Sequence, residues 1–224
     1  MKFLFYKPIK ASGDENNVIF WSDTHFGHRC EQWDLPLWKT RGFNSIEEHD
    51  EIIIKRWNAI ANQHSTFFHL GDFMFGRDTV QRFKDIVHRL NFETLYLMPG
   101  NHCSGWKQNF EEHVRNVWDV SCNKRVVFIP NYVETYVNEQ PIVMCHYPLA
   151  SFNGQGKGSW MLHGHCHGNL YKSEIGPILY KTKIVEIGIE KFPNPLTFGD
   201  LKNFFKDREN LTFDHHNNNT KNPF

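Results

Sequence analysis

Short, continuous runs of apolar residues recur between residues 18 and 145, and polar stretches separate them. Uninterrupted apolar runs of this length are typical of strands that are buried on both faces of a sheet. Five such runs predict strands at Val18–Trp21, Thr66–Leu70, Thr94–Met98, Val126–Ile129 and Ile142–Cys145. We expect these five strands to form the centre of the fold.

Between these runs the apolar positions change to helical spacing. Ser45 and Glu48 have the spacing of a capping box, and apolar residues then recur every three or four positions to about Gln63. Amphipathic stretches predict further helices over residues 79–90, 106–117 and 198–206. Strands that alternate with helices predict an α/β domain.

Composition narrows the class of protein. The 224 residues include 25 Lys and Arg against 25 Asp and Glu, whereas an electrostatic nucleic-acid binder should show a basic excess. The apolar run Phe3–Tyr6 is too short for a signal peptide or a membrane span. Five cysteines without a repeated spacing indicate neither a disulfide framework nor a zinc knuckle. We expect a cytoplasmic protein with one domain over residues 1–210 and a disordered, Asn-rich tail over residues 211–224.

Polar side chains with metal-binding or catalytic chemistry follow the predicted strands. Asp23 and His25 come after the first strand, Asp72 after the second, and Asn101 with His102 after the third. Two further clusters, at residues 145–148 and 163–167, also follow apolar runs. Because ligands bind beyond the carboxyl ends of parallel strands in α/β sheets, we expect these groups to converge there.

The order of these motifs is more informative than any one of them. In a chain of this composition, Gly-Asn-His is expected by chance about 0.09 times and Gly-His-x-His about 0.06 times. The ordered set Asp-x-His, Gly-Asp, Gly-Asn-His, His and Gly-His-x-His resembles the calcineurin-like metallophosphoesterase family. The resemblance is greatest to a small prokaryotic and phage-type branch, and it spans about residues 17–205. The segments that carry it are Ser22–His28, His69–Phe73, Gly100–His102, His146–Leu149 and Leu162–Gly168.

The resemblance implies an α/β fold, a four-layer α-β-β-α sandwich of two mixed sheets, with a two-metal site at the sheet edges. It assigns one divalent ion to Asp23, His25, Asp72 and His167, and the other to Asp72, Asn101, His146 and His165. A shared carboxylate such as Asp72, together with a bridging hydroxide, offsets the repulsion between two dications that lie ~3.5–4 Å apart. Imidazole with a few oxygen ligands suits Mn, Fe, Zn, Co or Ni better than Ca.

The same resemblance assigns catalysis to His102, which would protonate the leaving group or stabilise charge that develops on the phosphate. Family members usually carry an acid at the next position, where this chain has Cys103. A thiol is a weak hydrogen-bond partner, so this difference bears on how His102 is oriented. Four further residues are candidate phosphate contacts, with support of the metal ligands as the alternative for the two histidines. They are His28, Arg29, Lys157 and His163.

The predicted function is hydrolysis of a phosphomonoester or small phosphodiester by in-line attack of the bridging hydroxide. A metal-dependent nuclease is the main alternative, although the balanced charge does not favour it. A binding scaffold on the same fold, as in the retromer subunit that resembles this family, would tend to lose ligands. Storage of metal by a His-rich protein would not explain why the histidines follow strands. No segment is long enough for a cap domain, so residues 26–44 and 151–159 are expected to select a small phosphorylated substrate.

Overall fold

A computed structural model describes residues 9–29, 36–75, 79–102, 124–179 and 181–210. Within these ranges, the strands are β1 (Ile9–Ala11), β2 (Val18–Trp21), β3 (Thr66–His69), β4 (Thr94–Leu97), β5 (Arg125–Phe128), β6 (Tyr132–Val137), β7 (Gln140–Cys145), β8 (Trp160–His163), β9 (Ile184–Glu186) and β10 (Leu196–Thr197). The helices are α1 (Leu37–Thr40), α2 (Ile46–Ile60), α3 (Thr79–Arg89), α5 (Gly176–Leu179) and α6 (Phe198–Phe205), with 3₁₀ turns η1 (Gln155–Lys157) and η2 (Leu170–Lys172).

The strands form two mixed five-stranded sheets. One sheet has the order β10-β2-β3-β4-β5, in which β2 to β5 run parallel and β10 is antiparallel. The other has the order β1-β6-β7-β8-β9, in which β7, β8 and β9 run parallel. A parallel bridge between Ser22 and Gly188 joins the two sheets just beyond the ends of β2 and β9. The carboxyl ends of the parallel strands of both sheets therefore meet in one region.

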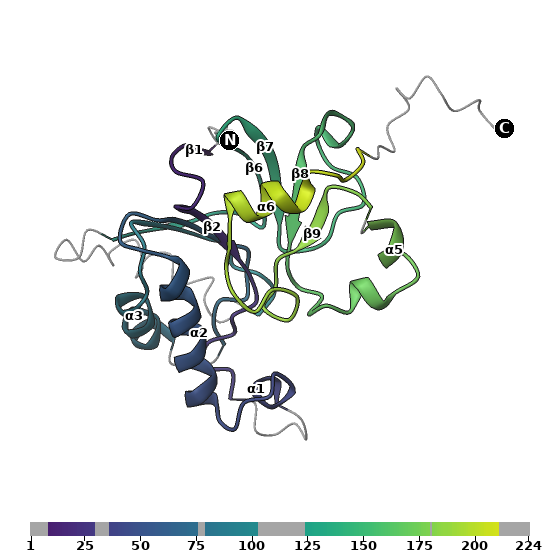
Figure 1. Cartoon of the computed structure of the whole chain (residues 1–224). Helices are drawn as coiled ribbons and strands as arrows, with labels where there is room; N and C mark the ends of the chain where they lie inside the picture. Colours follow the sequence, from purple (N-terminus) through teal and green to yellow (C-terminus); the bar gives the residue numbers. More distant parts are fainter. Residues whose placement is uncertain (1–8, 30–35, 76–78, 103–123, 180, 211–224) are drawn as a thin grey trace, which may run out of the picture.

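Apolar side chains fill the space between the sheets and cover their outer faces. Phe20 and Phe68 stack in the layer between the sheets, with ring centroids 5.3 Å apart. On the outer face of the β2 sheet, Trp57 of α2 stacks on Phe67. The outer face of the β7 sheet is covered by Phe152 and by part of α5. Figure 1 shows α2 and α3 together on one side of the molecule and α5 on the other.

This arrangement confirms the predicted α/β sandwich. All five predicted strands are present, and their ends lie within two residues of the predicted ones. Helix α2 begins after Ser45, whose hydroxyl accepts a hydrogen bond from the Glu48 backbone N–H, and it ends at Ile60 rather than near Gln63. The helix predicted over 106–117, Cys103 and the tail lie outside the described residues. Among those residues, no helix is long and apolar enough to span a membrane.

Candidate metal centre

The residues singled out from the sequence follow five strands whose carboxyl ends meet. Asp23 and His25 follow β2, Asp72 follows β3, and Asn101 with His102 follows β4. From the other sheet, His146 follows β7, while His165 and His167 follow β8. All seven candidate metal ligands thus come to one edge of the sandwich, together with His102.

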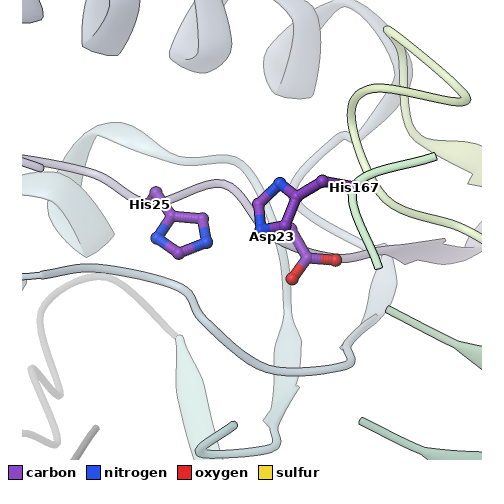
Figure 2. A group of neighbouring side chains, drawn as sticks. All are labelled: Asp23, His25 and His167. Carbon is purple, nitrogen blue, oxygen red and sulfur yellow. The ribbon is translucent and has the colours of Figure 1, made fainter. Parts of the chain in front are cut away.

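The side chains form two overlapping groups that could hold metal ions. Ligand atoms of Asp23, His25 and His167 lie within 4.8 Å of one another, and Figure 2 shows these three side chains. Atoms of Asp23, Asp72 and His146 form a second group with the same spacing. Four of these five residues are almost fully buried, and His167 is partly buried.

The two groups share Asp23, and the Asp72 carboxylate of the second group also lies close to His25 of the first. Its Oδ2 is 3.6 Å from His25 Nε2 and 3.5 Å from His146 Nε2. Within the described part of the chain, both Asp72 Oδ2 and His25 Nε2 are buried without a hydrogen-bond partner. Such orphaned polar atoms are costly unless a cation or a donor satisfies them. The other oxygen, Oδ1, accepts a hydrogen bond of 2.9 Å from the His102 backbone N–H, which fixes the carboxylate.

Asn101 links two histidines of the second proposed ligand set beside Asp72. His146 Nδ1 donates to the Leu70 carbonyl at 2.8 Å, because a carbonyl can only accept. The Asn101 Oδ1 atom lies 2.7 Å from His146 Nε2 and 2.8 Å from His165 Nδ1. These three atoms are therefore close enough together to serve one cation.

The residues of the first group differ in protonation, and His25 is the one whose pKa shift favours the form that binds a metal. Burial and the charge of Arg41 lower the pKa of His25 well below its usual value, which leaves the neutral ring that metal ligation requires. His167 Nδ1 donates to Glu190 Oε1 at 2.6 Å, so its Nε2 is the atom left for a metal. Burial raises the pKa of Asp23, because the nearby histidines only partly offset the loss of solvation. A dication beside this carboxylate would stabilise its charged form.

The loops hold these side chains in an uncommon backbone conformation. Five non-glycine residues of the centre have positive φ, between 49° and 73°. They are Asp23, His25, Asp72, His165 and His167. Such left-handed residues are sparse in proteins and concentrate at functional sites. Two glycines allow the close approach of the loops, since a Cβ at Gly71 would overlap the His146 ring and one at Gly100 would overlap Asp72.

His102 lies at the mouth of the centre. Its Nε2 is 3.9 Å from Asp72 Oδ2, and its side chain is 33% exposed, in contrast to the buried rings around it. It contacts His25 edge-on, with ring centroids 5.3 Å apart. This ring is therefore next to the cluster and open to a molecule that arrives from solvent.

Comparison with known proteins agrees with this geometry. The sequence profile described as calcineurin-like phosphoesterase matches residues 17–223. The chain belongs to this family. An uncharacterized protein of Methanocaldococcus jannaschii is 25% identical to this chain over 169 residues, which cover 75% of this chain and 79% of the relative. The Gene 66 protein of Mycobacterium phage L5 is 24% identical over 180 residues, covering 70% of this chain and 81% of the phage protein.

A solved structure has the same fold. The crystal structure of a protein of unknown function from Aquifex aeolicus superposes on this chain with a TM-score of 0.58 and 18% sequence identity. The match covers 83% of this chain and 97% of the other. At this identity the likeness concerns the fold, namely the two packed sheets.

The four candidate phosphate contacts lie in different surroundings. His28 is buried, its Nδ1 is 3.2 Å from His25 Nδ1, and its ring stacks on Phe75. His163 is fully buried, and its Nδ1 donates to the Gly164 carbonyl at 2.9 Å. Burial lowers the pKa of each ring to about 4, so both are neutral. The structure therefore places both histidines beneath the centre, where His28 can fix the ring of His25.

The two basic candidates are not brought to the cluster. The Arg29 side chain is 58% exposed and pairs with Glu47 at 2.8 Å. Lys157 is exposed and comes three residues before Trp160, where β8 begins, whereas the centre follows the other end of β8. The Gly158 carbonyl next to it accepts a hydrogen bond from Gln140, the first residue of β7. Lys157 thus lies at the opposite edge of the sheet, which corrects its assignment as a phosphate contact.

Two charged residues at the centre were not predicted from the sequence. Arg41 donates to the Asp23 and Thr24 carbonyls and pairs with Glu190 at 2.6 Å. Burial would raise the pKa of Glu190, but hydrogen bonds and charges from His167 and Arg41 lower it to about 2. Glu190 follows β9, as the other site residues follow their strands, and that position is the signal that could have identified it. For Arg41 the sequence holds no comparable signal.

Proposed function

We propose that this chain is a dinuclear metal-dependent phosphohydrolase that cleaves a phosphomonoester or a small phosphodiester. The observation that carries the proposal is the position of Asp72 Oδ2. It lies at nearly equal distances from His25 Nε2 and His146 Nε2, and in the described part of the chain it is buried without a hydrogen-bond partner. A carboxylate in this position can serve two cations at once.

The proposed ligands divide into two sets that share Asp72. The first set is Asp23, His25, Asp72 and His167, and the second is Asp72, Asn101, His146 and His165. Two divalent transition-metal ions in these sets would acidify a water to supply the nucleophile and would neutralise charge on a phosphoryl group. The donor atoms, imidazole nitrogens with a few oxygens, favour Mn, Fe, Zn, Co or Ni.

The residues around the centre favour an anionic substrate. Only Asp23 and Asp72 of the seven ligands carry negative charge, so two dications would leave the site with a net positive charge. The phosphate group of an ester is the anion that this charge would attract and orient.

His102 is proposed as the general acid. Its Nε2 faces the Asp72 side of the cluster, and its side chain is 33% exposed and so open to a molecule from solvent. It would donate a proton to the leaving oxygen or stabilise charge on the phosphate. Its backbone N–H holds Asp72 Oδ1, so one residue positions the bridging carboxylate and supplies the proton.

Metal stoichiometry tests the cation sites. Elemental analysis after reconstitution with Mn²⁺ should approach two equivalents for the wild type. The Asp72→Ala variant should weaken both sites, since Asp72 alone belongs to both sets. Asp85→Ala is the matched control, because Asp85 lies on α3, where it accepts a hydrogen bond from Gln81 at an exposed position. One equivalent in saturating Mn²⁺ would refute the shared-carboxylate assignment.

A substrate panel tests the reaction. We expect hydrolysis of nitrophenyl phosphate or bis-nitrophenyl phosphate in the presence of Mn²⁺, Ni²⁺ or Zn²⁺, and its loss in Asp72→Ala. Nucleoside monophosphates, cyclic nucleotides and short oligonucleotides extend the panel. Cleavage of oligonucleotides with no turnover of small esters would favour the nuclease alternative.

A further inference from the structure

Arg41 is a buried arginine that uses all five of its guanidinium N–H groups. Its side chain is 6% exposed. Nε donates a hydrogen bond to Glu190 Oε1 at 2.9 Å. Nη2 donates two, one to Glu190 Oε1 at 2.6 Å and one to the Asp23 carbonyl at 2.7 Å. Nη1 bonds to the Thr24 carbonyl at 3.1 Å and to His49 Nε2 at 2.9 Å. No N–H group remains for a substrate, although Arg41 lies in the loop expected to select one.

The partners of Arg41 connect two loops of the candidate metal centre. Asp23 and Thr24 belong to the loop after β2, which also carries His25. Glu190 belongs to the segment after β9 and accepts the His167 Nδ1 proton at 2.6 Å. Arg41 therefore contacts the backbone of one proposed ligand and, through Glu190, the ring of another.

Helix α2 supports Arg41 from its other side. His49 Nδ1 lies 2.9 Å from Asp50 Oδ1, an acceptor, so Nδ1 carries the proton and Nε2 accepts from Arg41. Burial lowers the pKa of His49, consistent with a neutral ring. The Asp50 carboxylate in turn accepts from the Gly27 N–H, at 3.0 and 3.2 Å to its two oxygens. The chain of bonds thus runs from α2 to both ends of the β2 loop.

We propose that Arg41 and Glu190 are positioning residues for the first cation site. This inference rests on the proposed two-cation function. Glu190 holds the His167 ring so that its Nε2 faces Asp23, and Arg41 fixes Glu190 and the Asp23 backbone in one frame. A carboxylate behind a metal-binding histidine fixes the ring orientation and raises its basicity as a ligand. The second site, around His146 and His165, meets this frame at Asp23, whose carboxylate accepts from the His165 backbone N–H at 3.1 Å. In the described part of the chain, neither Arg41 nor Glu190 bonds to the ring of either histidine.

A plain stabilising ion pair is the competing explanation. Exposed pairs such as Arg89 with Glu51, whose side chains are 46% and 60% exposed, contribute little to stability. The Arg41 pair differs because its bonds end on two proposed ligand residues. A lysine would keep the charge but cannot make five bonds in a fixed plane. Loss of function in Arg41→Lys would therefore report on geometry rather than on charge.

The test measures Mn²⁺ binding in the full-length chain, without any substrate. Metal-free protein is titrated with Mn²⁺ against a competing chelator, and electron paramagnetic resonance reports whether the bound ions are coupled. Glu190→Ala and Arg41→Lys should each weaken one of the two sites by roughly 10–100-fold and leave the other unchanged. Intermediate Mn²⁺ concentrations should then give an uncoupled, mononuclear signal, where the wild type gives the coupled one.

Three comparisons make the result decisive. Glu190→Gln keeps an acceptor oxygen for His167 and should lie between the wild type and Glu190→Ala. Arg89→Lys and Glu51→Gln, at the exposed pair, should bind Mn²⁺ as the wild type does. A thermal melting curve in EDTA shows which variants fold. If Glu190→Ala does not fold, the Mn²⁺ affinities of Glu190→Gln and Arg41→Lys test the inference.

Wild-type affinity at both sites in the folded variants would overturn the inference, and so would an equal loss at both sites. A wild type that binds a single Mn²⁺ would instead refute the two-cation proposal. The inference would then stand or fall on whether Glu190→Gln and Arg41→Lys weaken that single site.

Discussion

Replacement of His102 by alanine separates catalysis from metal binding. The substitution removes a ring whose Nε2 is 3.9 Å from Asp72 Oδ2, too far for a hydrogen bond. It keeps the backbone N–H that holds Asp72 Oδ1 at 2.9 Å. The bridging carboxylate should therefore stay in place, and His102→Ala should bind metal as the wild type does.

Turnover should fall by the contribution of a general acid, roughly 10²–10⁴-fold. Since each tenfold change in rate corresponds to about 1.36 kcal/mol, the activation barrier should rise by roughly 2.7–5.4 kcal/mol. Only a leaving oxygen that needs a proton experiences this loss in full. Nitrophenolate leaves readily as an anion, so its ester should lose much less activity than an alkyl or phenyl ester.

The assay compares kcat for nitrophenyl phosphate and phenyl phosphate at saturating Mn²⁺, together with elemental analysis of each sample. His64→Ala is the matched control, because His64 is exposed and, among the described residues, its hydrogen bond is made by its backbone N–H to Asn62. If the two esters lose the same factor, proton donation is not the role of His102. If His102→Ala loses metal, the ring is a ligand and the division of roles is wrong.

Three further predictions concern the loops and the cations. Gly100→Ala should abolish stable metal binding, because the new Cβ would overlap Asp72 and the backbone φ there is +79°. Gly13→Ala is the control and should bind metal normally, because its Cβ would meet open space and its φ is not in the positive range. EDTA should lower the melting temperature by roughly 10–20 °C, since a ligand at 100-fold excess over Kd stabilises by about 2.7 kcal/mol at each of the two sites. Cys103→Asp should raise turnover for phenyl phosphate more than for nitrophenyl phosphate, because a carboxylate orients His102 better than a thiol does; equal rates would show that Cys103 has no such effect.

The strands of the centre could be predicted because of how they are buried. All four residues of β2 and the last four of β7 are buried, and such strands read as unbroken apolar runs. The polar residue that follows each run then marks the carboxyl end of a strand. Parallel pairing brings these ends together, so one rule located residues that are more than a hundred positions apart.

The elements that were not predicted have other patterns. Strand β6 alternates exposed and buried residues from Tyr132 to Val137, because one of its faces is open to solvent. Strand β9 has three residues, fewer than the runs used for prediction, and Glu190 was missed with it. Arg41 reaches Asp23 and Thr24 through a loop and a long side chain, and no sequence period encodes such a contact.

Five residues with positive φ at one centre show that its loops are held by the surrounding structure. Each such residue costs on the order of 1–3 kcal/mol, and glycine would avoid the cost but has no side chain to bind a metal. Backbone bonds across the sheet hold the loops, such as His25 N–H to the Asp72 carbonyl at 2.9 Å and Asp23 N–H to the Gly71 carbonyl at 3.1 Å. Arg41 adds two side-chain bonds to the same Asp23 loop. These bonds involve backbone atoms of the proposed ligands, so a change of one ligand side chain should remove its donor atom and leave the loop in place. Changes at Gly100 or Arg41 should do the reverse, since they keep every donor atom and disturb the geometry.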